Sequence, residues 1–121
     1  MLLLGLFVAG VVGAPTRYLV DGFVLDHSDG ALPLGTFVIN VSGSLILGFL
    51  AGLVLYHGFP ASSRVVLGTG FCGAYTTFST FAYETIRLAE QGERSAALRV
   101  VVASLVVPAL AAALGLALAT L

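Results

Sequence analysis

The chain has 121 residues, of which 59% are hydrophobic and only 9% are charged, so it is too apolar for an ordinary soluble domain. Its net charge of −1 provides no basic face for nucleic acid and no polybasic lipid anchor, which excludes a nucleic-acid-binding function. These properties predict a single all-α transmembrane domain over residues 1–121.

Four apolar segments are long enough to cross a bilayer, whose hydrocarbon core needs about 20 apolar residues per helix. We expect transmembrane helices at 2–24, 34–56, 64–88 and 98–120, joined by short connections. A cleaved signal peptide is the rival interpretation of the first segment. Because no basic residue precedes its apolar run, we expect it to be a transmembrane helix instead.

The first predicted helix carries Arg17, close enough to its end for the side chain to reach the membrane surface. Two interpretations stay open. Arg17 is either an interfacial anchor beside Tyr18 or a source of positive potential at the mouth of an anion pathway. Beyond this helix, His27 falls in a predicted connection, as His57 does after the second helix, and we expect both to be solvated rather than metal ligands.

The second predicted helix has a small or polar residue at every fourth position, which predicts one stripe formed by Asn40, Ser44, Gly48 and Gly52. Gly48 and Gly52 form a GxxxG pair, which is typical of closely packed helices. Asn40 is harder to explain, because an unpaired carboxamide in hydrocarbon costs on the order of 2–7 kcal/mol. It either bonds a neighbouring helix or lines a wet path.

The third predicted helix contains the run "GFCGAYTTFSTF", residues 70–81, which is rich in glycines and hydroxyls. Its poor helix formers are Gly68, Gly70, Gly73, Thr76 and Thr77, and glycine costs roughly 1 kcal/mol relative to alanine inside a helix, so we expect a break in this helix. Freed carbonyls at membrane depth need protein or water as partners, and they can coordinate cations. Cys72, the only cysteine, is expected to be a small buried hydrophobic residue.

Beyond the expected break, Thr77, Thr80 and Glu84 are spaced by three and four residues, which predicts a polar track along one helix face. Phe78 and Phe81 lie on an adjoining face. Core packing is one interpretation of this aromatic pair, and attraction of an anion by the partly positive ring edges is the other. No nucleophile set or acid–base pair is present, so we predict that the protein is not an enzyme.

The arginines give a weak orienting signal. Arg87, Arg94 and Arg99 lie on the side of the first and third connections, against Arg64 on the side of the second connection and both termini. Since the excess of positive charge orients a membrane protein, so small a bias predicts insertion in both orientations. Such insertion allows an antiparallel homodimer.

The run "GFCGAYTTFSTF", together with "GTFVINVSGS" at 35–44 and "GVVGAPTRY" at 10–18, resembles the Fluc (CrcB) family of fluoride channels. The resemblance covers the first three predicted helices, and the fourth adds little. It implies a dual-topology antiparallel homodimer in the cell membrane, with two pores that export fluoride passively in strong preference to chloride. Fluoride, membrane lipid and a second copy of the chain are therefore the expected partners.

The resemblance also implies roles for individual residues. Asn40 matches an asparagine that hydrogen-bonds the ion, and Phe78 and Phe81 match pore-lining aromatics. Arg17 matches the basic residue of the first helix. Further polar residues match a track beyond the aromatics: Ser79, Thr80, Glu84 and, in the fourth helix, Ser104. Backbone carbonyls of Gly73 and Thr76 match a break that holds a structural sodium ion, Na+, on the dimer axis.

Four positions depart from the family pattern: Ala9 and Ala74 stand where a second glycine is frequent, Val100 where tyrosine is common, and Pro108 where a second hydroxyl is expected. The main rival class is the small multidrug exporters, which are dual-topology and proton-coupled. They depend on an acidic residue in the first helix, whereas Asp21 lies near the membrane edge; Glu84 is the one side chain that keeps proton coupling open. A non-transporting assembly subunit is a third class, which leaves Asn40 unexplained.

Overall fold

The computed structural model describes residues 1–121 as helices joined by short connections. Three helices are long and apolar enough to cross a membrane: α1 (Leu2–Asp26), α2 (Leu34–His57) and α6 (Arg94–Leu118). They confirm the first, second and fourth predicted helices, although α6 begins at Arg94 rather than at residue 98 and ends at Leu118.

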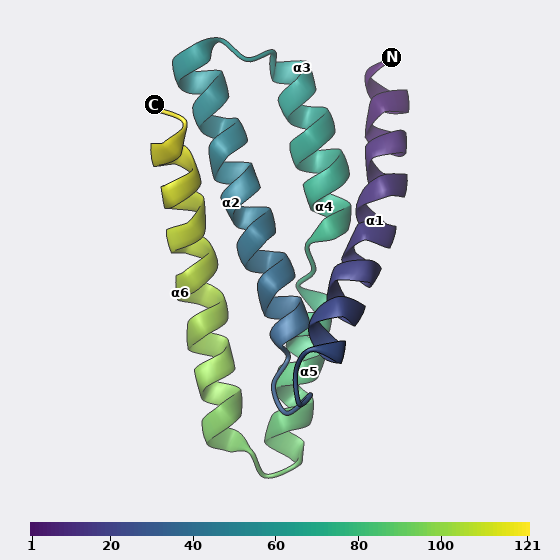
Figure 1. Cartoon of the computed structure of the whole chain (residues 1–121), viewed down its shortest axis with the longest axis vertical. Coiled ribbons are helices and arrows are strands. Elements are labelled where there is room, and N and C mark those ends of the chain that lie inside the picture. Colours follow the sequence, from purple (N-terminus) through teal and green to yellow (C-terminus); the bar gives the residue numbers. More distant parts are fainter.

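In place of one continuous helix at 64–88, the third segment consists of shorter pieces. A first rod joins α3 (Ala61–Arg64), η1 (Val65–Cys72) and α4 (Gly73–Tyr75), and α5 (Ser79–Glu90) follows after a non-helical stretch. Figure 1 shows the rod descending between α2 and α1 to mid-height, with α5 continuing toward the opposite end of the molecule.

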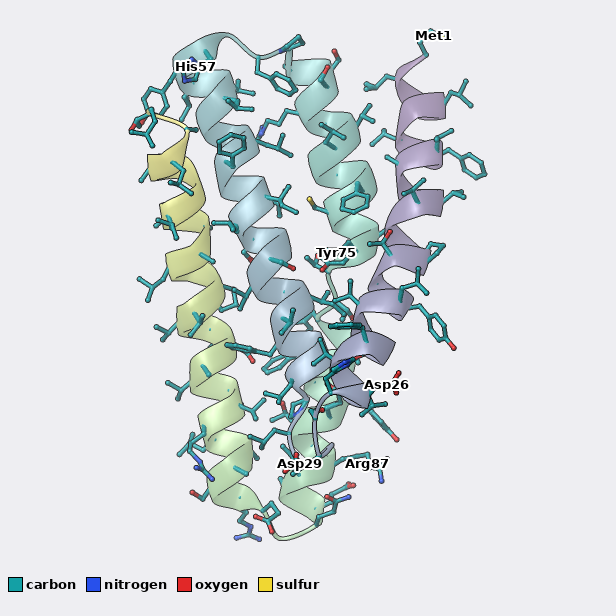
Figure 2. All side chains as sticks on the ribbon, in the orientation of Figure 1. Met1, Asp26, Asp29, His57, Tyr75 and Arg87 are labelled. Carbon is teal, nitrogen blue, oxygen red and sulfur yellow. The ribbon has the colours of Figure 1, made fainter.

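The four segments alternate in direction along the long axis of the molecule. Both termini and the connection between α2 and α3 lie at one end, as Figure 1 shows, and the other two connections lie at the opposite end. Figure 2 likewise places Met1 and His57 at one end, and Asp29 and Arg87 at the other. The predicted alternation of the connections is therefore confirmed.

Small residues bring α2 and α6 into close contact. A side chain added at Gly48 would collide with the backbone of Ala112, and one added at Gly52 would collide with Ala119. In return, Gly115 of α6 lies against the backbone of Leu45. Because lipid offers no hydrophobic drive for helix association, such close backbone approach is a main source of packing energy. The packing role predicted for the GxxxG pair is confirmed.

The predicted single stripe of small and polar residues on α2 is wrong, because it is divided between two neighbours. Gly52 packs on α6, whereas Asn40 bonds the segment between α4 and α5. An α-helix has 3.6 residues per turn, so each four-residue step rotates the side chain by about 40° beyond a full turn. Three steps from Asn40 to Gly52 amount to about 120°, enough to change partners.

Helix α1 packs against η1 through a second set of small residues. Gly13 is buried, and a side chain at this position would collide with the carbonyl of Phe71. Gly70 of η1 lies as closely against Ala9 and Leu6. Cys72, also in η1, is fully buried, as predicted. The outward faces carry large exposed hydrophobic residues, which suits contact with lipid or with another chain.

Both histidines are exposed, as expected of solvated side chains, but His57 lies within a helix rather than in a connection, and both rings contact backbone carbonyls. His57 is the last residue of α2, and its Nε2 lies 2.7 Å from the carbonyl oxygen of Ala119, just beyond α6. His27 follows α1 directly, with Nδ1 2.8 Å from the carbonyl of Phe23. Both rings are exposed, yet each satisfies a carbonyl at a helix end, where the helix itself offers no donor.

Candidate functional site

The helical backbone of the third segment stops at Tyr75 and resumes at Ser79. Thr76 has an extended conformation, with φ −79° and ψ 162°. The glycines at 68, 70 and 73, which were expected to weaken the helix, remain helical within η1 and at the start of α4. The interruption lies at Thr76 and Thr77, the other poor helix formers of the predicted break, and at Phe78.

Asn40 of α2 bonds the interruption in both directions. Its Nδ2 donates to the carbonyl oxygen of Thr77 at 2.8 Å, and its Oδ1 accepts the N–H of Thr77 at 2.9 Å. A primary amide presents the same donor and acceptor as a peptide group, and it keeps a second Nδ2 hydrogen for another acceptor. Within the single chain, Asn40 therefore hydrogen-bonds a neighbouring segment, which is the first of its two predicted roles.

Two further residues of α2 contact the same interruption. The hydroxyl of Ser42 lies 2.9 Å from that of Tyr75, whose side chain is buried. A side chain added at Gly43 would collide with the methyl group of Thr76. Sequence reasoning missed both contacts, although the spacing of Gly43 three residues after Asn40 places it on the same face and is typical of a close approach.

Two carbonyls at the interruption have lost their usual helical donors. In an α-helix each carbonyl accepts the N–H four residues later. The N–H of Thr77, which would reach Gly73, donates to Asn40 Oδ1 instead. The N–H of Thr80, which would reach Thr76, donates to Thr77 Oγ1 at 3.3 Å. The carbonyls of Gly73 and Thr76 are therefore freed by side chains that capture their donors.

Arg17 of α1 turns toward the interruption. Its Nη1 lies 3.5 Å from the carbonyl oxygen of Thr76, a long hydrogen bond, and the residue is half-buried. Its neighbour Tyr18, by contrast, is 79% exposed. A fixed positive charge thus lies beside the freed carbonyl.

Hydroxyl groups cluster where α5 begins. Thr77 Oγ1 donates to Thr80 Oγ1 at 3.1 Å, besides accepting the Thr80 N–H, and it lies 3.4 Å from the Ser79 hydroxyl. The first N–H groups of a helix have no helical partner, and Thr77, which precedes the N-cap residue Phe78, accepts that of Thr80. Thr77 therefore ends the interruption and starts α5 with the same side chain, which the sequence did not indicate.

Phe78 and Phe81 lie beside this hydroxyl cluster. Their ring centroids are 5.7 Å apart and the rings are inclined by 59°, a tilted arrangement that aromatic pairs favour. Phe81 is half-buried, but Phe78 is 77% exposed. Core packing within the single chain therefore does not account for Phe78.

Thr80 and Glu84 line a pocket of about 440 Å³ at the end of the molecule that holds the first and third connections. Asp21 of α1 and Arg87 of α5 also line it, and neither was predicted. The Oε2 atom of Glu84 is buried and has no hydrogen-bond partner within the chain. The pocket therefore brings together two of the polar residues beyond the interruption, Thr80 and Glu84.

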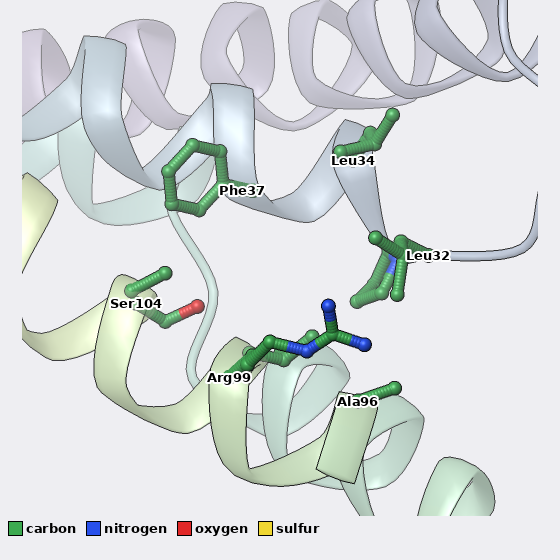
Figure 3. A pocket seen from close by; sticks show the side chains of 9 residues that line it. Leu32, Leu34, Phe37, Ala96, Arg99 and Ser104 are labelled. Atoms are coloured by element: carbon green, nitrogen blue, oxygen red, sulfur yellow. The ribbon is translucent and has the colours of Figure 1, made fainter. Parts of the chain in front are cut away.

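Ser104 lies in a different place from the other predicted site residues. It lines a pocket of about 180 Å³ between α6 and the start of α2, together with Phe37, Arg99 and Val100. Figure 3 shows the side chains of Arg99 and Ser104 at this pocket, opposite Phe37 and Leu34. Within one chain, Ser104 therefore does not share a pocket with Thr80 and Glu84.

Comparison with known proteins gives a consistent result over nearly the whole chain. Residues 4–116 match the family model described as CrcB-like protein, Camphor Resistance (CrcB). A protein of Frankia casuarinae named fluoride-specific ion channel FluC 1 is 49% identical, over 94% of this chain and 93% of its own.

Two further relatives carry the same kind of name. The fluoride-specific ion channel FluC 1 of Leifsonia xyli subsp. xyli is 45% identical over 96% of this chain and 85% of its own. The fluoride-specific ion channel FluC of Pyrococcus abyssi is 46% identical over 94% of this chain and 92% of its own. With this coverage and three helices able to cross a membrane, the chain is a multi-pass membrane protein that belongs to the CrcB family.

Proposed function

We propose that this protein is a fluoride-selective channel that lets fluoride leave the cell passively through the inner membrane. The relatives named fluoride-specific ion channels support this function, since the chain covers most of their length. They also support a channel rather than an enzyme. The observation that carries the proposal is the interruption at Thr76–Phe78, which gathers an amide, hydroxyls and two aromatic rings at one place.

The chemistry of this place suits a small, strongly hydrated anion. Compact donors can replace the water of the ion, and the second Nδ2 hydrogen of Asn40 and the hydroxyls of Ser79 and Thr80 are such donors. The ring edges of Phe78 and Phe81 attract an anion weakly and exclude water and larger halides. Conduction requires binding that is weak enough to release the ion, which a few neutral donors provide.

Further charged and polar side chains lie at the interruption and in the two pockets near it. Arg17 supplies positive potential that draws an anion inward. Thr80 and Glu84 line the water-accessible pocket at one end of the molecule. We assign Ser104 to the far end of the track, where its own pocket also contains Arg99.

An antiparallel homodimer completes the channel. Phe78 is 77% exposed in the single chain, so a pore wall at this position needs a second surface to close it. Each subunit is one domain of residues 1–121. A two-fold axis relates the two subunits, so any pore formed at their interface occurs twice, which yields two pores per dimer. The weak arginine bias supports insertion in both orientations.

A structural sodium ion fits the freed carbonyls. Oxygen atoms are the ligands that hard cations prefer, and the carbonyls of Gly73 and Thr76 have both lost their helical donors. Arg17 approaches the Thr76 oxygen at 3.5 Å, but a carbonyl has two lone pairs and can serve both. Two oxygens from each subunit would hold the ion on the dimer axis, where it would bridge the interrupted segments of the two subunits.

Fluoride efflux from liposomes tests this function. Purified protein is reconstituted into vesicles loaded with potassium fluoride, valinomycin is added to release potassium, and external fluoride is followed with an electrode. A channel empties the vesicles rapidly without any pH gradient. A proton-coupled exporter of organic cations and an assembly subunit both leave the fluoride inside, and neither class has support among the relatives.

A further inference from the structure

We infer that Asn40 is a positioning residue that couples the sodium site to the anion pathway through the peptide groups of Thr77. This inference rests on the proposed function, and it assigns to Asn40 a second role besides contact with the ion. The side chain controls whether the Gly73 carbonyl is available to a cation, although it touches neither that carbonyl nor the cation.

Two acceptors, the Gly73 carbonyl and the Asn40 side chain, compete for the N–H group of Thr77. In a continuous helix the N–H of Thr77 would donate to the carbonyl of Gly73. Asn40 Oδ1 accepts it instead, at 2.9 Å. Without this acceptor the helix can extend by one hydrogen bond, and the Gly73 carbonyl then loses its free lone pair to Thr77. The cation ligand therefore exists only while Asn40 holds the interruption open.

The second hydrogen bond fixes which way the Asn40 amide faces. The Thr77 N–H can meet only an oxygen and the Thr77 carbonyl can meet only an N–H, so the two bonds assign the oxygen and nitrogen of Asn40 without ambiguity. The remaining Nδ2 hydrogen, which we assign to the anion, is therefore oriented by the same pair of bonds. Loss of the interrupted conformation removes the cation ligand and the oriented donor together.

Coupling between the two sites follows from thermodynamic linkage. A sodium ion that binds the freed carbonyls stabilises the interrupted conformation, and that conformation orients the Asn40 donor for the anion. The dependence is reciprocal, since both sites favour the same arrangement of Thr77. The other contacts of α2 with this segment, through Ser42 and Gly43, involve Tyr75 and Thr76 and leave the peptide groups of Thr77 alone.

Three variants separate the two roles of Asn40. Asn40→Leu removes both bonds to Thr77. Asn40→Asp keeps an oxygen for the Thr77 N–H, loses the donor to the Thr77 carbonyl, and places a negative charge beside the anion. Ser42→Ala is the matched control, because it removes a hydrogen bond to the neighbouring Tyr75 and leaves Thr77 paired. Each protein is unfolded by heat, without fluoride, while sodium replaces N-methylglucamine at constant ionic strength.

The midpoint temperature of the wild type should rise with sodium. In Asn40→Leu the sodium concentration for half of this rise should increase at least about tenfold, because the Thr77 N–H has lost its side-chain acceptor and can return to the Gly73 carbonyl. Asn40→Asp and Ser42→Ala should keep the wild-type sodium response, although Asn40→Asp should lose fluoride efflux. A normal sodium response in Asn40→Leu, or an equal loss in Asn40→Asp, would overturn the inference.

If Asn40→Leu does not fold, amide hydrogen exchange of the wild type tests the coupling between the sodium site and Thr77 instead. Sodium should slow exchange at the Thr77 N–H, since it stabilises the conformation in which Asn40 accepts this group. Equal exchange at Thr77 with and without sodium would contradict the coupling. These readouts contain no fluoride, so a failed efflux assay of the wild type would reject the channel function without deciding the role of Asn40.

Discussion

The rings of Phe78 and Phe81 lie 5.7 Å apart and are inclined by 59°, although 77% of the Phe78 surface is exposed. The two rings contact each other inside the membrane-spanning region, but the rest of the chain leaves Phe78 uncovered. Such an arrangement suits a surface that a second copy of the chain covers. The pair follows directly from the interruption, since Phe78 precedes α5 and Phe81 lies in its first turn.

Replacing both phenylalanines by isoleucine should reduce fluoride efflux at least about a hundredfold while the protein remains a folded dimer. Isoleucine keeps the apolar volume but has no ring edge with partial positive charge. Phe7→Ile is the control, because Phe7 is 69% exposed on α1, away from the interruption. Efflux at the wild-type rate in the double variant would remove these residues from the pore wall.

The contact of Gly48 with α6 predicts a stability effect with an internal control. Gly48→Val should lower the free energy of unfolding by about 1–3 kcal/mol or more, because its side chain would collide with the backbone of Ala112. Gly22→Ala should change it by less than about 1 kcal/mol, since nothing lies within 4 Å of the added methyl. Denaturant titration in detergent measures both. Equal effects at the two positions would contradict the tight packing of α2 on α6.

The hydrogen bond that the Thr80 N–H donates to the Thr77 hydroxyl predicts that Thr77→Val destabilises the start of α5 by about 1 kcal/mol. Valine matches threonine in shape but cannot accept the Thr80 N–H. Amide hydrogen exchange at Thr80 should therefore become faster. Thr77→Ser, which keeps the hydroxyl, should restore slow exchange at Thr80. Equally fast exchange in the serine and valine variants would show that the hydroxyl does not hold the Thr80 N–H.

Insertion in both orientations is testable because Cys72, the only cysteine, is fully buried. A cysteine introduced at the exposed Gln91, between α5 and α6, is then the one accessible thiol. A membrane-impermeant maleimide applied to intact cells should label about half of the molecules, and all of them after permeabilisation. Labelling of nearly all or nearly none in intact cells would establish a single orientation and exclude the antiparallel dimer.

The sequence predicted the membrane-spanning segments more accurately than the interruption. Helices α1, α2 and α6 follow from long runs with almost no charge, because only a helix satisfies the backbone in lipid. Of the poor helix formers that predicted the break, the glycines at 68, 70 and 73 remain helical, whereas Thr76 and Thr77 lie in the interruption. What ends the helix at Thr76 is competition by side chains for backbone N–H groups, which propensity does not record.

The hydrogen-bonding partner of Asn40 and the location of Ser104 could not be predicted, because both depend on how the helices pack against one another. The sequence indicated that Asn40 needs a hydrogen-bonding partner, but not that the partner is Thr77, because this depends on how α2 is rotated against two neighbours. Ser104 was placed on the same track as Glu84 by resemblance alone. In the single chain, the two residues line two different pockets, which adjoin at Leu32, Pro33 and Leu34 before and at the start of α2.

Selective fluoride transport by the purified protein tests the central claim most directly. Vesicles containing the protein are loaded with equal concentrations of potassium fluoride and potassium chloride, valinomycin is added, and both anions are measured outside. The account predicts that fluoride leaves within seconds to minutes while chloride stays inside, and that Asn40→Asp vesicles retain both. Fluoride release no faster than from empty vesicles, or equal release of chloride, would contradict it.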